Sequence, residues 1–268
     1  MTGVLDGKVA VITGGASGLG IAMVEAFVAE GCRVVVADVD RENGEAVSGR
    51  FGSDVAFRPA DVADPGDMRT LTDYAVDQFG GLDVMVNNAA IPGSLFPTLL
   101  DTNFDQFDRV MRVNLLGVMA GTQQAARHMA GSGGGSIVNI SSIAGVQPTA
   151  GPFMYSASKA AITHFTKCAA LDLGEHGIRV NCIAPAHVPT PILGRFLDSL
   201  PPAEKEARLK EIRAGMLARQ PLKRAGTGRD IAEAVVYFAS ERSCYVTGTV
   251  LSVDGGAAGG APPVRPRK

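Results

Sequence analysis

The sequence predicts an α/β fold, a doubly wound parallel sheet of about seven strands with helices on both faces. Short apolar, β-branched runs alternate with stretches of helical spacing along all 268 residues. The strand-like runs are apolar throughout instead of alternating with polar residues, as in a parallel sheet covered on both sides. Because no linker, repeat or low-complexity segment interrupts this order, we expect a single domain over residues 1–268.

The first half of the chain supplies four predicted strands. "KVAVIT" at 8–13 is a buried run that ends in glycines, and the helix after it stops at Gly31. Later runs carry the same β-branched pattern, and Pro65 opens a helix at the position that proline favours. The predicted strands are 8–13, 33–40, 55–62 and 82–90, and the helices after them are 21–31, 41–51, 65–81 and about 104–130.

The second half adds three strands and an insertion. Strands are predicted at 133–142, 178–186 and 248–256. Helices are predicted at 155–177 and 228–241, and residues 201–220 combine an early proline with dense helix formers. Ligands of such sheets bind outside the carboxyl ends of the strands. We therefore expect the chemistry at Gly14, Asp38, Asp61, Asn87, Ser141 and Pro185, which follow or end the strands.

Composition excludes several classes of function. The formal net charge is −2 and the basic residues are scattered, so we expect no nucleic-acid partner. No apolar run reaches the ~18 residues of a membrane span, and the start lacks a signal-peptide pattern. The four cysteines form no C-x-x-C pair, so we expect no metal and a cytoplasmic location. Prolines and basic residues at 257–268 predict a flexible tail.

The glycine-rich loop "TGGASGLG" at 13–20 predicts a dinucleotide site. Glycines let the backbone approach a pyrophosphate, and the helix N-terminus offers free N–H groups. Asp38 ends the second strand, where a carboxylate can hold the adenosine ribose hydroxyls. It would repel the 2′-phosphate of NADP, so we expect NAD, with Arg41 as the nearby opposing cation. An alternative role for Asp38 is the N-cap of the next helix.

"YSASK" at 155–159 places Tyr155 one helical turn before Lys159. An ammonium held on the same helix face lowers the pKa of a phenol, which turns tyrosine into an acid/base near neutral pH. A surface tyrosine beside a solvated lysine is the alternative for the pentapeptide alone.

The chain resembles the short-chain dehydrogenase/reductase family over about residues 6–256. The resemblance rests on the ordered motifs "TGGASGLG", "DV" at 61–62, "NNAA" at 87–90, Asn114, "NISS" at 139–142, "YSASK", "PAHVPT" at 185–190 and "LSVDGG" at 251–256. It implies a Rossmann-type fold, a homotetramer and a lid over the substrate at about 190–222. The long helices 104–130 and 155–174 would pack between subunits.

The resemblance also implies a mechanism. Tyr155 would exchange a proton with the substrate oxygen, Ser142 would hydrogen-bond that oxygen, and Lys159 would lower the pKa of Tyr155 and bind the nicotinamide ribose. Asn114 would hold a water of a proton relay. The expected cofactor-binding residues are Gly14, Ser17, Gly18, Leu19, Gly20, Asp38, Val39, Asp61, Val62, Asn88, Ala89, Tyr155, Lys159, Pro185, Val188 and Thr190.

Two positions depart from the family pattern. Ala90 stands in "NNAA" where glycine is usual, and Ala186 replaces the glycine of the usual Pro-Gly pair. Because alanine tolerates positive φ poorly, the loop after the sixth strand is expected to follow a slightly different path.

Apolar residues in the 190–222 segment predict a hydrophobic substrate, a cyclic, terpenoid or steroidal secondary alcohol or ketone. Expected substrate contacts are His187, Gln147, Phe196 and Met216. The leading function is therefore an NAD-dependent alcohol dehydrogenase or carbonyl reductase. An NADPH-dependent 3-oxoacyl-carrier-protein reductase is the alternative enzyme, and a non-catalytic dinucleotide sensor on the same fold is the alternative of another class.

Overall fold

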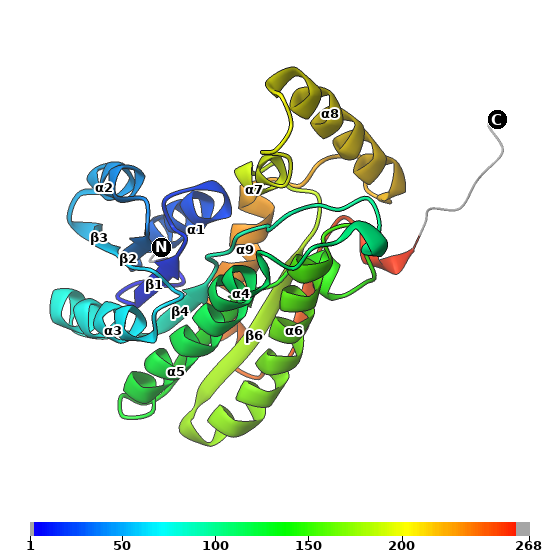
Figure 1. The fold of residues 1–268 in the computed structure, drawn as a ribbon. Coiled ribbons are helices and arrows are strands. Elements are labelled where there is room, and N and C mark those ends of the chain that lie inside the picture. Colours follow the sequence, from blue (N-terminus) through cyan, green and yellow to red (C-terminus); the bar gives the residue numbers. More distant parts are fainter. Residues whose placement is uncertain (1–2, 261–268) are drawn as a thin grey trace.

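The computed structural model describes residues 3–260 and contains the predicted parallel sheet (Figure 1). Seven strands lie in the order β3-β2-β1-β4-β5-β6-β7, and every neighbouring pair is parallel. The chain winds from β1 out to β3 and then crosses back to β4, which makes the sheet doubly wound. The strands are β1 Val9–Thr13, β2 Arg33–Asp38, β3 Val55–Pro59, β4 Val84–Asn87, β5 Gly135–Ile140, β6 Ile178–Pro185 and β7 Val250–Val253.

Helices cover both faces of the sheet, as predicted. Apolar residues of α1, α2 and α9 share one buried cluster with one face of the strands. Those of α3, α5 and α6 form the cluster on the other face (Figure 1). The helices are α1 Gly18–Ala29, α2 Arg41–Gly49, α3 Pro65–Phe79, α4 Phe107–Met111, α5 Gly117–Met129, α6 Phe153–Leu173, α7 Pro191–Arg195, α8 Pro202–Arg219 and α9 Gly228–Ala239.

Local sequence explains where several helices begin and end. The Asp64 side chain accepts a hydrogen bond from the Gly66 N–H, Pro65 follows as the first helical residue, and α3 ends at Gly80 with φ 86°. Thr227 and Asp230 form a reciprocal capping box at the start of α9. These caps satisfy backbone groups that the helices themselves leave free.

Several elements differ from the prediction. The fourth and seventh strands span only Val84–Asn87 and Val250–Val253 instead of 82–90 and 248–256, and two other differences have a clear local cause. The third strand ends at Pro59 instead of residue 62, because the chain turns there and the Asp61 N–H bonds to the Asp67 carboxylate. The long helix predicted at 104–130 is α4 and α5 joined by a π-helical segment, Arg112–Leu116. A π segment inserts an extra residue into the helical ladder without ending the apolar stripe, so the sequence pattern does not reveal it.

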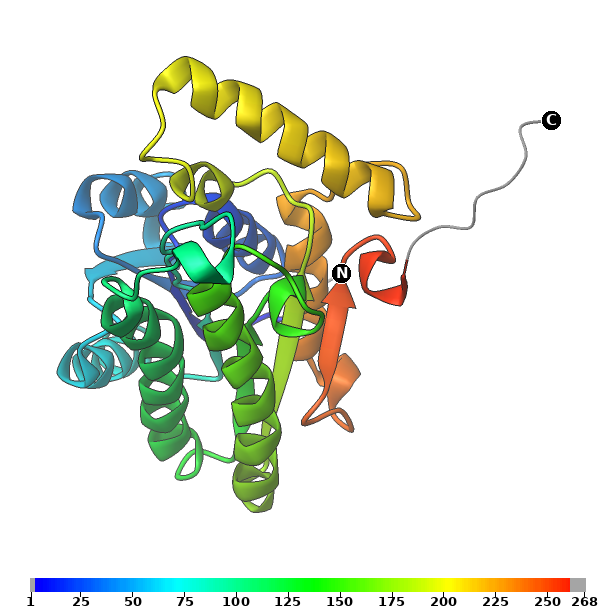
Figure 2. The same ribbon diagram turned by 45° about the vertical axis from the view of Figure 1, so that its right-hand side comes forward.

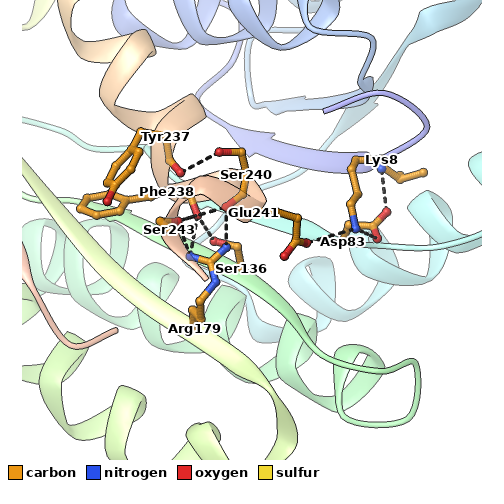
Figure 3. A network of polar contacts seen from close by, with 10 residues as sticks. Lys8, Asp83, Ser136, Arg179, Tyr237, Phe238, Ser240, Glu241 and Ser243 are labelled. Atoms are coloured by element: carbon orange, nitrogen blue, oxygen red, sulfur yellow. Dashed lines mark hydrogen bonds and ion pairs between the residues drawn. The ribbon is translucent and has the colours of Figure 1, made fainter. Parts of the chain in front are cut away.

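The amino ends of the strands are closed by a polar network (Figure 3). The Arg179 guanidinium donates to Phe238 O at 2.8 Å, Ser243 Oγ at 2.7 Å and Ser240 O at 3.2 Å. These bonds satisfy carbonyls at the end of α9. Lys8 lies 3.4 Å from Asp83 beside them. Hydrogen bonds and an ion pair thus fill the amino ends of the strands, and a ligand site is expected at the opposite, carboxyl ends.

Above the carboxyl ends lies α8, the uppermost helix in Figure 2. None of the residues of α8 is buried. At the start of the segment expected as a flexible tail, Ala257–Gly259 form a 3-10 turn that follows β7. The remainder of that tail, 261–268, lies outside the described residues.

Candidate active site

A cavity of about 1300 Å³ opens at the carboxyl ends of the strands. The glycine loop and the ends of β2, β3 and β4 form one side, and the ends of β5 and β6 form the other. Residues of α7 and α8 cover it. Nearly all the expected site residues line this one cavity; Gly20, which packs beneath the loop, Asn87 and Asn114 do not.

The glycine loop has the shape of a phosphate cradle. Gly14 and Gly18 have φ of 64° and 53°, which favour glycine. A Cβ on Gly14 would lie 2.8 Å from the Ala89 Cα, and one on Gly20 would collide with the Gly14 carbonyl oxygen. Gly20 therefore lets α1 pack against the loop, and the N-terminus of α1 opens onto the cavity. These residues fit a dinucleotide, because its pyrophosphate needs close backbone approach and free N–H groups.

Side chains from β1 and β4 hold the loop in place. Asn88 Nδ2 donates to Thr13 O at 2.9 Å and to Gly14 O at 3.1 Å. Thr13 Oγ1 accepts from the backbone N–H groups of Asn88 and Ala89. The role of Thr13 could not be predicted from sequence, because a side-chain hydrogen bond across more than seventy residues leaves no local pattern.

Asp38 lies at the cavity edge beside Val39, which is 72% exposed. Its Oδ2 accepts from the Ala16 N–H at 3.1 Å, and its Oδ1 accepts from the Asp40 N–H at 3.1 Å. The alternative of Asp38 as an N-cap is wrong, because Asp40 caps α2. Asp61 and Val62 line the cavity farther along the same side.

Tyr155, Lys159 and Ser142 converge on the other side of the cavity. Lys159 is buried, its Nζ donates to Ile140 O at 2.9 Å, and it lies 5.6 Å from the Tyr155 ring centroid. Ser142 Oγ accepts from the Ala144 N–H at 3.2 Å. The neighbouring Ser141 hydroxyl donates to Lys159 O at 2.8 Å and so links α6 to the end of β5.

The ionisation of this group differs from the expectation. Burial raises the pKa of Tyr155 to about 12, and the Ser142 hydroxyl opposes that rise. Burial also lowers the pKa of Lys159 to about 8. The phenol pKa is thus raised and not lowered as expected, because burial disfavours the charged phenolate. The Lys159 ammonium donates to Ile140 O. At neutral pH Tyr155 is therefore a phenol that can donate a proton.

Asn114 lies in the π segment and is fully buried behind the cavity wall. Its Oδ1 accepts from the Ile91 N–H, and its Nδ2 donates to Ile91 O at 2.9 Å and to Ser158 Oγ at 3.1 Å. Ser158 Oγ in turn donates to Tyr155 O at 2.7 Å. Asn114 thus connects to the backbone of Tyr155 through Ser158, a residue that the sequence analysis did not identify.

The loop after β6 brings Pro185, Val188 and Thr190 to the cavity. Neither alanine substitution strains the backbone: within residues 3–260, no residue other than glycine has positive φ. Ala90 and Ala186 both line the cavity.

All four expected substrate contacts line the cavity: His187, Gln147, Phe196 and Met216. The Phe196 ring meets Tyr155 edge-on, with centroids 5.4 Å apart and planes at 84°. Ile192, Leu193 and Ile212 add apolar surface, whereas Leu197 is buried in the body of the protein. Ala257 and Gly260 complete the rim, although the sequence placed them in a flexible tail.

Comparisons with known proteins agree with this geometry. A family model described as enoyl-(acyl carrier protein) reductase matches residues 14–258. The chain belongs to the short-chain dehydrogenase/reductase family. Among the residues described, no helix is long and apolar enough to cross a membrane, and no group of three or more metal-ligating side chains gathers.

Its relatives include enzymes named for cyclic and terpenoid compounds. It is 41% identical to (+)-borneol dehydrogenase 2 of Salvia officinalis, over 94% of this chain and 89% of that protein. It is 39% identical to zerumbone synthase of Zingiber zerumbet, over 94% and 95%. The crystal structure of levodione reductase superposes with a TM-score of 0.87 at 32% identity, covering 95% of this chain and 99% of that one.

Proposed function

We propose that this protein is an NAD(H)-dependent dehydrogenase or reductase of hydrophobic, cyclic or terpenoid-like secondary alcohols and ketones. The observation that carries the proposal is the convergence of Tyr155, Ser142 and Lys159 on one apolar cavity beside a dinucleotide cradle. The names of the relatives support the substrate class.

The proposed roles follow from the positions of the groups. Tyr155 donates its phenol proton to a ketone oxygen or takes one from an alcohol, and Ser142 hydrogen-bonds the same oxygen. Lys159 places a cation under the phenol ring. Asn114, through Ser158, holds the first turn of α6 that carries Tyr155. A bound nicotinamide dinucleotide supplies or accepts the hydride.

The residues that would hold the cofactor run along the cavity from the ribose end to the nicotinamide end. Asp38 favours NAD, because its carboxylate stands where the 2′-phosphate of NADP would add negative charge. The proposed cofactor contacts are Gly14, Ser17, Gly18, Leu19, Asp38, Val39, Asp61, Val62, Asn88, Ala89, Tyr155, Lys159, Pro185, Val188 and Thr190. Gly20 supports the loop from beneath and is proposed to act through Gly14.

We also propose a cytoplasmic homotetramer. Its support is the exposed apolar surface of the helices that pack between subunits in the expected arrangement. Phe107, Met119 and Leu171 leave 41%, 42% and 87% of their surfaces exposed. Large apolar side chains of this kind, when contiguous, mark association surfaces.

The test is absorbance at the NADH band with purified protein, a panel of cyclic secondary alcohols and ketones, and NAD(H) and NADP(H) in parallel. Tyr155→Phe is measured beside the wild type. We expect turnover with NAD(H) that the variant loses by at least about 10³-fold, in the range of a lost acid/base. Tight NAD binding without turnover of any panel member would instead support a dinucleotide sensor. Turnover of 3-oxoacyl thioesters with NADPH alone would support the carrier-protein reductase.

A further inference from the structure

His187 is held rigidly at the wall of the cavity. The Val188 N–H donates to Ala186 O at 2.8 Å, which closes a γ-turn centred on His187. The Gly226 N–H donates to the His187 carbonyl oxygen at 2.8 Å. With its backbone fixed on both sides, the imidazole lies against the cavity with 9% of its surface exposed.

The two ring nitrogens of His187 are in different surroundings. Nδ1 is enclosed and has no hydrogen-bond partner in the described part of the chain. Nε2 also has no protein partner there, but it is not enclosed, so it is the nitrogen that a ligand in the cavity can reach. Burial, with the charge of Arg213, lowers the pKa of His187, so the ring is neutral at pH 7.

A neutral imidazole carries its proton on one nitrogen only. A proton on Nδ1 would be a buried N–H without an acceptor, which proteins avoid more strictly than an unused acceptor. The favoured tautomer therefore carries the proton on Nε2. His187 then presents one N–H donor to the cavity, and no protein acceptor pairs with it in the described part of the chain.

We propose that His187 Nε2 donates a hydrogen bond to a second oxygen of the substrate, apart from the carbon that reacts at Tyr155. The substrate is then a cyclic diketone or hydroxyketone, not a simple cyclic alcohol or ketone. This inference rests on the proposed function and specifies its substrate class. A polar group that is left unpaired when the substrate lacks the matching atom discriminates strongly against that substrate.

The kinetic test compares cyclohexanone with cyclohexane-1,2-, 1,3- and 1,4-dione, with NADH as the reductant. The readout is the ratio of kcat/KM for each dione to kcat/KM for cyclohexanone. His187→Phe keeps a ring without the donor, His187→Gln keeps an amide donor, and His176→Phe replaces an exposed histidine elsewhere. Intrinsic differences in carbonyl reactivity cancel when the same ratio is compared between variants.

For at least one dione we expect His187→Phe to lower this ratio by about tenfold, the worth of a hydrogen bond between neutral groups. His187→Gln should restore part of it, and His176→Phe should leave it unchanged. An equal ratio in wild type and His187→Phe overturns the inference while the proposed function stands. If His187→Phe raised only the KM for NADH, His187 would contact the cofactor and not the substrate, and the inference would also be overturned. No turnover of any ketone overturns both.

The tautomer is tested without turnover. The chain has four histidines, so ¹⁵N-histidine labelling gives a small set of ring signals, and His187→Phe assigns the one in question. We expect the Nε2–H tautomer between about pH 6 and 8. An Nδ1–H tautomer would make Nε2 an acceptor and overturn the proposed donor role.

Discussion

Lys159 Nζ lies 5.6 Å from the centroid of the Tyr155 ring, while its hydrogen bond goes to Ile140 O at 2.9 Å. The two side chains are one turn apart on α6. Their contact is a cation–π interaction between the ammonium and the ring, and no hydrogen bond joins the ammonium to the phenol oxygen. Lys159 therefore carries a buried charge in the folded protein, which has a measurable consequence for stability.

We predict that Lys159 makes the free energy of unfolding depend on pH. Its pKa is lowered from 10.5 to about 8, so between these values the unfolded chain binds more protons at this group than the folded one. Its contribution to stability therefore rises with pH from about 8 to 10.5. The free energy of unfolding of wild type, minus that of Lys159→Met, should rise by about 2 kcal/mol from pH 7.5 to 10, since one pKa unit corresponds to about 1.4 kcal/mol.

Urea titration of both proteins across this range measures the difference. Taking it between the two proteins removes the effect of Cys32, whose pKa burial raises to about 12 and which does not interact with Lys159. Lys167→Met, which removes an exposed lysine from the same helix, is the control. A difference that stays constant with pH would contradict the prediction.

We predict that Asp38 sets the preference for NAD. Asp38→Asn should reduce the ratio of kcat/KM for NAD to that for NADP by about tenfold or more, because unit charges ~4 Å apart near a protein surface interact by about 4 kcal/mol before further screening. Asp40→Asn removes a negative charge two residues farther along the chain and keeps a side chain that can cap α2. It should change the ratio far less. Equal effects of the two variants would contradict the prediction, because the cofactor preference would then depend on the overall negative charge of the cleft and not on Asp38 itself.

We predict that Gly20 is required for folding of the loop and not only for binding. A Cβ there would collide with the Gly14 carbonyl oxygen and lie 2.7 Å from the Gly15 Cα, and both obstacles are backbone. Gly20→Ala should lower the free energy of unfolding by about 3 kcal/mol, the upper range for overpacking. Gly49→Ala meets open space and should stabilise by about 0.5 kcal/mol. Thermal unfolding of both variants checks this, and a folded, equally stable Gly20→Ala would refute it.

We predict that Phe196 contributes to substrate binding through its contact with Tyr155. Phe196→Ala removes the edge-on ring 5.4 Å away and should raise the KM for a cyclic ketone about tenfold, in line with an aromatic pair and its apolar area. The affinity for NAD should stay unchanged in a fluorescence titration. Leu200→Ala, in the same segment but off the cavity, is the control; if it raised KM as much, the effect would come from the segment as a whole.

The sheet could be predicted from sequence because parallel strands covered on both faces read as continuous apolar runs, as at Val34–Ala37. The position of the cavity followed, since strand ends meet at one edge. The π segment could not be predicted, because Arg112–Leu116 keeps the apolar stripe of its neighbours. Thr13 and Ser158 were missed because their hydrogen bonds join residues that only the fold brings together.

The pKa values of Tyr155 and Lys159 could also not be predicted from the sequence. The spacing of Tyr155 and Lys159 suggested that the lysine lowers the phenol pKa, but it could not show that both groups are desolvated or that Ile140 O takes the ammonium. A pKa depends on burial and on the direction of each bond, neither of which spacing determines.

Helix α8 contributes no buried residue to the protein, although it stands over the cavity. Substitutions on it consequently carry little penalty for folding, whereas a change in β5 or α6 disturbs the packed interior. In the course of evolution such a segment can exchange one set of side chains for another while the sheet and the proton-transfer residues below it persist. Directed evolution toward new ketones would be well served by mutating residues 202–219 before any other part of the chain.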